Sequence, residues 1–308
     1  MAKYAFLFPG QGAQYVGMGK DLYETSDAAR GVIDTVDSIL DKDLKAVMFE
    51  GPEDTLKKTD YAQPAIFAAS MAAMRAMQEK CPDVKPAFTA GLSLGEYSAL
   101  AASGALSVED TVRLIERRGA FMQEAADQKK GAMAAVIGLD PEAIRKICDQ
   151  SGAEVANFNA PDQTVITGEA AAVEAACGKL TEAGAKRVIP LSVSGAFHSS
   201  LMQSAADKFR EVLDRTEFAQ AEVPLIGNAD AQVCISSDEI RAELVGQITS
   251  SVQWVKTIAY MAGEGVDTFI EIGPGKVLKG LLRRIDRGLT VVNVEKADDL
   301  DQLSAEPA

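Results

Sequence analysis

Residues 85–102 read KPAFTAGLSLGEYSALAA, and this stretch decides the fold. The segment 85–90 is typical of a buried strand, and the segment 96–102 is typical of a helix. Between them stands Gly91-Leu92-Ser93-Leu94-Gly95, a Gly-x-Ser-x-Gly motif whose glycines let the backbone bend without a Cβ clash. The stretch therefore predicts a strand–turn–helix unit that exposes the Ser93 hydroxyl at a sheet edge. A purely structural turn is the alternative.

A serine in such a turn becomes a nucleophile when a base takes its proton, and histidine is the usual base. The chain contains a single histidine, His198, which follows a predicted strand. If Ser93 reacts by serine–histidine chemistry, His198 must be the base; a lone histidine is otherwise an ordinary surface or core residue. The amide N–H of Leu94 would lie at a helix N-terminus, where it can stabilise an oxyanion.

The rest of the chain predicts a large α/β-hydrolase-like domain, residues 1–126 and 196–308, with a small domain inserted at 127–195. The small domain follows the order β-α-β-β-α-β, which is typical of a ferredoxin-like fold. Its predicted strands and helices are 131–139, 141–150, 154–159, 164–167, 170–183 and 187–193. In the large domain we expect further strands at 4–8, 223–227 and 268–272, and helices at 62–80, 109–126, 199–215, 237–249, 252–263 and 276–285.

The composition is that of a globular protein, with 308 residues, 47% hydrophobic and 25% charged. A net charge of −14 argues against nucleic acid and anionic membranes as partners. Four scattered cysteines and one histidine make a structural zinc site unexpected. The first apolar run is broken at Pro9-Gly10, and none is long enough to span a membrane. We expect a cytoplasmic monomer with reduced thiols, no metal and no cofactor.

Short motifs are spread over nearly the whole chain. They are Phe8-Pro9-Gly10-Gln11-Gly12, Ala62-Gln63-Pro64-Ala65, Gly91 to Glu96, Arg118-Gly119, Phe121-Met122-Gln123, Asn157-Phe158-Asn159 with Pro161, Gly195-Ala196-Phe197-His198-Ser199, Gln247 with Trp254, and Glu271-Ile272-Gly273-Pro274-Gly275. In this order they resemble the malonyl-CoA:acyl carrier protein transacylase family, the free-standing acyltransferases of bacterial fatty acid synthesis. Many dispersed motifs are more specific than any one of them.

The resemblance implies a ping-pong reaction. Malonyl would pass from malonyl-CoA to Ser93 and then to the phosphopantetheine thiol of acyl carrier protein. His198 would be the base, and Gln247 would orient it through a carbonyl oxygen. The other implied roles are backbone N–H donors of the oxyanion hole for Gln11 and Leu94, the carboxylate ligand for Arg118, and pocket residues for Gln63, Met122, Asn159 and Phe197.

The chemistry of arginine agrees with the role implied for Arg118. A planar guanidinium binds a carboxylate through two parallel hydrogen bonds, so it would select malonyl over acetyl. Without the resemblance, Arg118 would be assigned to a solvated helix face. Phe197 would narrow the pocket against a methyl branch. One position departs from the family pattern, which has histidine before the nucleophile where this chain has Leu92, and we expect this change to alter acyl-enzyme stability.

Acyl carrier protein is acidic in this family, and so is this chain, so docking requires a local basic surface. The candidates are Lys186, Arg187, Lys276, Lys279, Arg283 and Arg284. A merely solvated basic face fits equally well. Three other functions stay open: a trans-acting acyltransferase of a polyketide synthase, a serine thioesterase or hydrolase, and a non-catalytic module that binds carrier protein.

Overall fold

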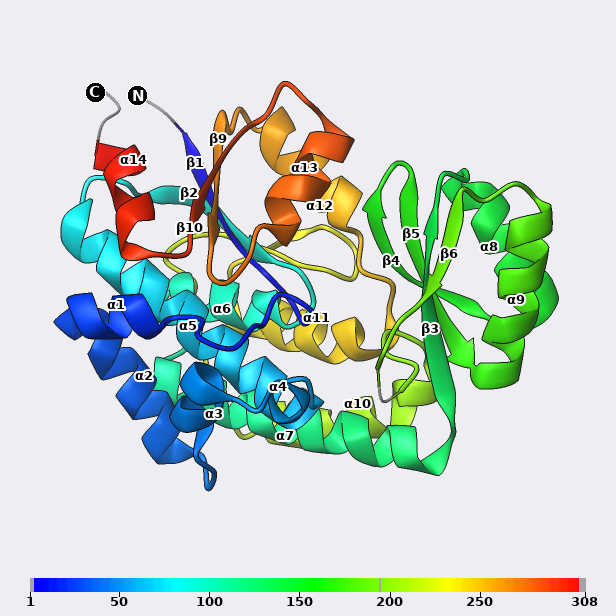
Figure 1. The fold of residues 1–308 in the computed structure, drawn as a ribbon, viewed down its shortest axis with the longest axis horizontal. Coiled ribbons are helices and arrows are strands. Elements are labelled where there is room, and N and C mark those ends of the chain that lie inside the picture. The colour runs from blue at the N-terminus through cyan, green and yellow to red at the C-terminus, as the bar shows by residue number, and fades with distance from the viewer. Residues whose placement is uncertain (1–2, 194, 305–308) are drawn as a thin grey trace.

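The computed structural model describes residues 3–193 and 195–304, which fold as a mixed α/β protein with two β-sheets (Figure 1). The larger sheet has the strand order β10-β9-β1-β2-β7-β8. Its neighbouring strands run parallel except β7 and β8. The strands are β1 (Tyr4–Phe8), β2 (Pro86–Gly91), β7 (Leu225–Ile226), β8 (Val233–Cys234), β9 (Thr268–Ile272) and β10 (Thr290–Val294).

Helices bury both faces of this sheet. Along β1, Phe6 and Phe8 join one apolar cluster, whereas Ala5 and Leu7 join another. The first cluster is built mainly with α2 (Asp27–Ile39), α3 (Leu44–Glu50), α5 (Thr59–Lys80), α6 (Gly95–Ala102), α7 (Val108–Gln128), α10 (Gln203–Leu213) and α11 (Ser237–Thr249), and the second with α12 (Trp254–Gly263) and α13 (Val277–Ile285). Short helices complete the chain: α1 (Lys20–Thr25), α4 (Glu53–Leu56) and α14 (Leu300–Ser304).

The register of β1 against β2 brings two loops together. Phe8 pairs with Gly91, the last residue of β2, and the Leu92 amide donates a hydrogen bond to the Phe8 carbonyl at 3.1 Å. The loop at residues 9–12 therefore lies beside the turn that carries Ser93. The carboxyl ends of central parallel strands are where open α/β sheets place their sites.

The second sheet is antiparallel, with strand order β4-β5-β3-β6, and lies with α8 and α9 at one end of the molecule (Figure 1). Its two faces are buried differently. Along β3, Ala134 and Val136 pack in a local cluster with α8 and α9, whereas Met133 and Ala135 belong to the main core. The elements are β3 (Gly131–Ile137), α8 (Pro141–Ser151), β4 (Glu154–Ala160), β5 (Gln163–Glu169), α9 (Ala170–Glu182) and β6 (Arg187–Pro190).

Polar contacts attach this unit to the rest of the molecule, among them those of Val252 and Arg284. Val252 lies beside β4, where its amide donates to the Ala156 carbonyl at 2.8 Å and its carbonyl accepts from the Phe158 amide at 2.9 Å. Arg284 on α13 binds both carboxylate oxygens of Asp162, each at 2.9 Å. The position of the small unit is therefore fixed by directional bonds as well as by the shared core.

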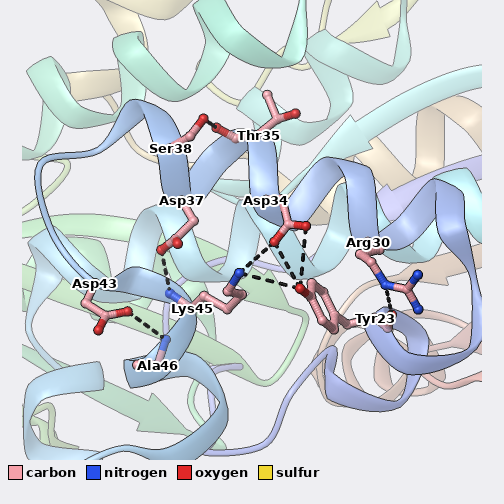
Figure 2. Close-up of polar contacts among 9 residues, drawn as sticks. All are labelled: Tyr23, Arg30, Asp34, Thr35, Asp37, Ser38, Asp43, Lys45 and Ala46. Atoms are coloured by element: carbon pink, nitrogen blue, oxygen red, sulfur yellow. Dashed lines mark hydrogen bonds and ion pairs between the residues drawn. The ribbon is translucent and has the colours of Figure 1, made fainter.

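A polar network joins Tyr23 of α1 to residues of α2 and α3 (Figure 2). Lys45 Nζ lies 2.7 Å from Asp34 Oδ1, which also accepts from the Tyr23 hydroxyl at 3.1 Å. The Lys45 amide donates to Asp37 at 2.8 Å. The Lys45–Asp34 pair is partly exposed, so we assign this network to local helix packing and not to a site.

Most predicted elements are present, and the differences have local causes. The helix 237–249 and the strand 268–272 match their predicted bounds. The predicted strand 223–227 shortens to Leu225–Ile226, because the Gly227 amide turns to the Gln232 carbonyl and starts the unpredicted β8. The predicted helix 199–215 begins as a 3₁₀ turn, Ser200–Met202. No helix in the described ranges is long and apolar enough to cross a membrane.

Candidate active site

The turn at Ser93 joins β2 to α6 as the sequence predicts. Ser93 has a φ of 54°, in the left-handed region that residues other than glycine rarely adopt. A Cβ on Gly91 would lie 1.9 Å from the Gly95 carbonyl carbon, and a Cβ on Gly95 would lie 2.1 Å from the Phe8 carbonyl oxygen. Close backbone approach therefore requires both glycines.

Asn228 holds this turn from the end of the neighbouring strand, β7. Its side chain is buried; Oδ1 accepts from the Ser93 amide at 2.7 Å, and Nδ2 donates to the Gly91 carbonyl at 2.7 Å. One side chain thus ties both arms of the turn and helps to keep Ser93 in its strained conformation.

His198 lies between Ser93 and Gln247. Its Nε2 is 2.7 Å from Ser93 Oγ, and its Nδ1 is 2.8 Å from the Gln247 carbonyl oxygen. Because a carbonyl oxygen only accepts, Nδ1 carries the hydrogen and Nε2 is left to accept a proton. Burial, followed by the charge of Arg118, lowers the pKa of His198 to about 4. The imidazole is therefore neutral at neutral pH, the form that a general base requires.

Arg118 on α7 is a fully buried cation. Nη1 donates to Gln63 Oε1 at 3.1 Å, and Nη2 donates to Gln247 Oε1 at 2.9 Å and lies 3.5 Å from Ser93 Oγ. These are the side-chain hydrogen bonds of Arg118 to the described residues; all go to neutral groups, and its Nε has none. Buried charges are normally paired, so this arginine is suited to bind an anion next to Ser93.

The side chain of Gln247 links Arg118, Ser93 and Glu96. While Oε1 accepts from Arg118, Nε2 donates to the Ser93 carbonyl at 2.9 Å and to Glu96 Oε2 at 2.7 Å. Glu96 is fully buried, and its neighbour Glu243 accepts from the Ala229 amide at 2.8 Å. Burial above all, and for Glu96 then the charge of Glu243, raises the pKa of both carboxyl groups.

Ser93 lines a cavity of about 570 Å³. Asn159 is buried in its wall, and the Oδ1 atom has no partner among the described residues, so it can accept a hydrogen bond from a ligand. Leu92 also lines the cavity and packs against the apolar cluster that contains Trp254. Eight of the ten candidate site residues named from the sequence line this cavity together: Gln11, Gln63, Ser93, Arg118, Met122, Asn159, Phe197 and His198.

The two amide groups expected to form an oxyanion hole lie on the adjacent loops after β1 and β2. Neither the Gln11 nor the Leu94 amide donates a backbone or side-chain hydrogen bond within the part of the chain that the structure describes. Leu94 is buried at the start of α6, and the side chain of Gln11 is held by Thr59 and Gln63 at 3.3 Å each. Both N–H groups are thus free to bind an oxyanion.

Sequence reasoning did not identify Asn228, Glu96 or Glu243 as site residues. Two signals were present. Asn228 follows the predicted strand that becomes β7, and once β7 is known to run parallel beside β2, the residue lies at the same sheet edge as Ser93. Glu96 is the one acid in the otherwise neutral helix α6, and such a residue needs a buried partner.

The basic residues proposed for docking are exposed or partly exposed, in two groups. Lys186 and Arg187 lie at the start of β6. The chain after β6 is exposed at Leu191, which lines the cavity. Lys276, Lys279 and Arg283 lie on or beside α13. Arg284 differs from the others, because its guanidinium is already bound to Asp162 and Gln163.

A sheet-edge serine with a neutral histidine and an unpaired buried cation is suited to acyl transfer. The acyl transferase domain family matches residues 5–299, and the chain belongs to this family. A malonyl CoA-acyl carrier protein transacylase of Bacillus subtilis is 46% identical over 98% of this chain and 96% of its own length.

Solved structures agree with this relationship. The acyl-carrier-protein-S-malonyltransferase of Bartonella henselae is 43% identical with a TM-score of 0.94, covering 97% of this chain and 98% of that one. A malonyl-transacylase solved in complex with a type II PKS acyl-carrier protein is 40% identical with a TM-score of 0.95, covering 98% and 99%.

Proposed function

We propose that this chain transfers the malonyl group of malonyl-CoA to the phosphopantetheine thiol of acyl carrier protein, as an acyl-carrier-protein S-malonyltransferase. The observation that carries the proposal is the buried Arg118, which makes only neutral contacts and lies 3.5 Å from Ser93 Oγ. A malonyl thioester presents a free carboxylate two carbons from the carbonyl that Ser93 attacks. The names of the relatives support the same reaction.

In the first half-reaction Ser93 Oγ attacks the thioester carbonyl while its proton moves to His198 Nε2. The Gln247 carbonyl accepts the Nδ1 hydrogen of the imidazolium that forms. The amides of Gln11 and Leu94 stabilise the oxyanion of the tetrahedral intermediate. Collapse breaks the carbon–sulfur bond, CoA leaves with the proton from Nε2, and malonyl-Ser93 remains.

The second half-reaction reverses these steps with another thiol. The carrier-protein thiol gives its proton to His198 Nε2 and attacks the ester carbonyl of malonyl-Ser93. The second oxyanion occupies the same two amides, and its collapse returns the proton to Ser93 Oγ. The reaction needs no redox step, and we propose that it uses neither metal nor cofactor.

The cavity wall sets the choice of acyl group. Arg118 binds the malonyl carboxylate through paired hydrogen bonds, a contact that acetyl cannot make. Phe197 is buried in the wall and limits branching at the carbon between the two carbonyl groups. Gln63 holds Arg118, Met122 fills the apolar side, and Asn159 offers its free oxygen to an amide of the pantetheine arm.

We propose that the product serves fatty acid biosynthesis in the cytoplasm and that the enzyme is a monomer. Polyketide synthesis is the alternative pathway. It is supported by the similar malonyl-transacylase that was solved in complex with a type II PKS acyl-carrier protein. Comparing kcat/KM for a fatty acid and a polyketide carrier protein separates them: a large preference for the polyketide carrier would overturn the fatty acid assignment.

We further propose that the small unit is a ferredoxin-like domain at residues 127–195, inserted into an α/β-hydrolase-like domain formed by 1–126 and 196–308. The antiparallel strand order β4-β5-β3-β6 and the β-α-β-β-α-β order of elements support it. Residues 1–2, 194 and 305–308, which fall within these ranges, lie outside the described structure.

Intact mass after incubation with malonyl-CoA tests the function. Wild type should gain the mass of one malonyl group, and Ser93→Ala should gain none. Ser98→Ala is the matched control, because Ser98 is a buried serine of α6 that makes no bond to His198. Label retained in Ser93→Ala would reject the nucleophile.

Adding carrier protein separates transfer from hydrolysis. Holo carrier protein should take over the malonyl group, so the enzyme loses the label and the carrier protein gains it. Carrier protein without phosphopantetheine should leave the enzyme labelled. Release of free malonate at the same rate without carrier protein would identify a hydrolase. No labelling of wild type would favour a non-catalytic binding module.

A further inference from the structure

Glu96 is a buried acid three residues after the nucleophile Ser93, and the proposed steps of acyl transfer give it no role. It lies in the first turn of α6 and is fully buried. It forms no ion pair within the described ranges; its hydrogen-bond partner is the amide of Gln247, and its carboxyl neighbour is Glu243. A buried acid that stabilised the fold alone would be expected to bind a cation or several backbone amides.

The geometry of Gln247 shows what Glu96 controls. The Gln247 amide donates both hydrogens, one to the Ser93 carbonyl at 2.9 Å and one to Glu96 Oε2 at 2.7 Å. Since both partners accept, Nε2 must face them and Oε1 must face Arg118, whose Nη2 is 2.9 Å away. Reversing the amide would set its NH₂ group against the donors of Arg118. Glu96 therefore helps to fix the only orientation in which Gln247 can hold the guanidinium.

The charge of this acid matters as well. Burial and the neighbouring Glu243 raise the pKa of Glu96 well above its ordinary value, which favours the protonated form. A neutral carboxyl group still offers an oxygen to Gln247, yet it leaves the charge of Arg118 uncompensated. The positive charge then stays available for an anion that enters the cavity.

We propose that Glu96 is a positioning residue for acyl selectivity, which acts through Gln247 to hold Arg118 ready for the carboxylate of the acyl group. The inference rests on the proposed malonyl transfer and extends it to the residue that orders the selective contact. Gln63 holds the other guanidinium nitrogen, Nη1, at 3.1 Å, so the loss of Glu96 loosens the hold on Nη2 and leaves that on Nη1 in place.

The test compares malonyl-CoA with acetyl-CoA as acyl donors to the full-length enzyme, by rapid-quench measurement of acyl-enzyme formation. Glu96→Met removes the acceptor and keeps the volume. It should reduce the ratio of malonyl to acetyl acylation rates about tenfold, mainly through loss of malonyl transfer. Glu96→Gln restores an oxygen acceptor for Gln247, and it should recover most of the wild-type ratio.

Two further variants separate positioning from general stability. Glu271→Met is the matched control, because Glu271 is an equally buried acid that binds the amides of Leu278 and Lys279 away from the cavity. It should lower the melting temperature and leave the acyl ratio unchanged. Gln247→Ala keeps the carbonyl that binds His198 and removes the amide, so Glu96→Met should have little further effect in that background.

An unchanged acyl ratio in Glu96→Met, an equal fall for both donors, or additive effects with Gln247→Ala would each overturn the inference. These outcomes differ from failure of the proposed function, in which wild type itself would not be acylated by malonyl-CoA.

Discussion

The side chains of Ser93 and His198 meet at 2.7 Å, and both residues hold left-handed backbone conformations, with φ angles of 54° and 57°. Such a conformation costs a residue with a side chain about 1–2 kcal/mol. The strain is maintained by surrounding bonds, from Asn228 to the Ser93 turn and from the Gln247 carbonyl to the imidazole. The reactive pair is thus held in place by groups remote in sequence.

Arg118→Ala should lose the preference for malonyl over acetyl. The variant removes the cation that binds the carboxylate and leaves Ser93 and His198 in contact. We expect malonyl transfer to fall by about 100-fold, as for loss of a charge-assisted hydrogen-bonded pair, and neutral acyl groups to be accepted better. Steady-state kinetics with both donors measures this, and unchanged selectivity would reject the carboxylate ligand.

Acylation should persist into acid. Because the pKa of His198 is lowered to about 4, the neutral base survives at pH 5 and is lost only as the pH falls through about 4. The rate should be measured with acetyl-CoA, whose acyl group carries no carboxyl that titrates. Arg118→Met removes the second cause of the lowered pKa, so the midpoint should move to higher pH. A midpoint near 6.5 in wild type would contradict the buried, cation-facing imidazole.

Asn228→Ala should impair both stability and rate. It leaves the part-buried Ser93 amide and the buried Gly91 carbonyl without their side-chain partner, which costs about 1–3 kcal/mol. Urea unfolding gives the stability, and acyl-enzyme formation gives the rate. Asn293→Ala is the control, because Asn293 is a buried asparagine that binds the Gly275 carbonyl instead. A similar loss of rate in both variants would show that Asn228 has no specific effect on the turn.

Charge reversal on α13 should weaken carrier-protein binding selectively. Arg283→Glu should raise the KM for carrier protein about threefold and leave the KM for malonyl-CoA unchanged, since an exposed charge acts mainly on encounter. Arg284→Glu is not an equivalent test, because it also breaks the pair with Asp162. Asp162→Asn removes that pair while keeping Arg284 and serves as its control. Equal changes in both KM values would argue against docking at α13.

The sequence predicted the turn at Ser93 with its helix and strand because local rules govern it. Gly91 and Gly95 are required by contacts within a few residues or with the adjacent strand, and these requirements are visible in the motif. The apolar segment 131–139 likewise predicted a strand, which the structure places at Gly131–Ile137, although it did not reveal that one face joins the main core.

The supports of the site could not be predicted in the same way. Asn228 lies 135 residues from Ser93, and Gln247 lies 151 residues from Glu96. Contacts at such separations depend on strand order and on where the chain places α11 relative to the Ser93 turn, which periodicity does not encode. The resemblance to a family placed Gln247 near His198, but the bond between Gln247 and Glu96 and the pairing of Arg284 with Asp162 became visible only in three dimensions.

The distribution of the site along the chain has a consequence for synthesis of the protein. Ser93 is made early, His198 follows 105 residues later, and the carbonyl that orients His198 comes from residue 247. A ribosome-bound chain that has not yet released residue 247 has a serine without its oriented base. We therefore expect such a nascent chain to form little acyl-enzyme, because the reactive pair is complete only after residue 247 has folded against His198.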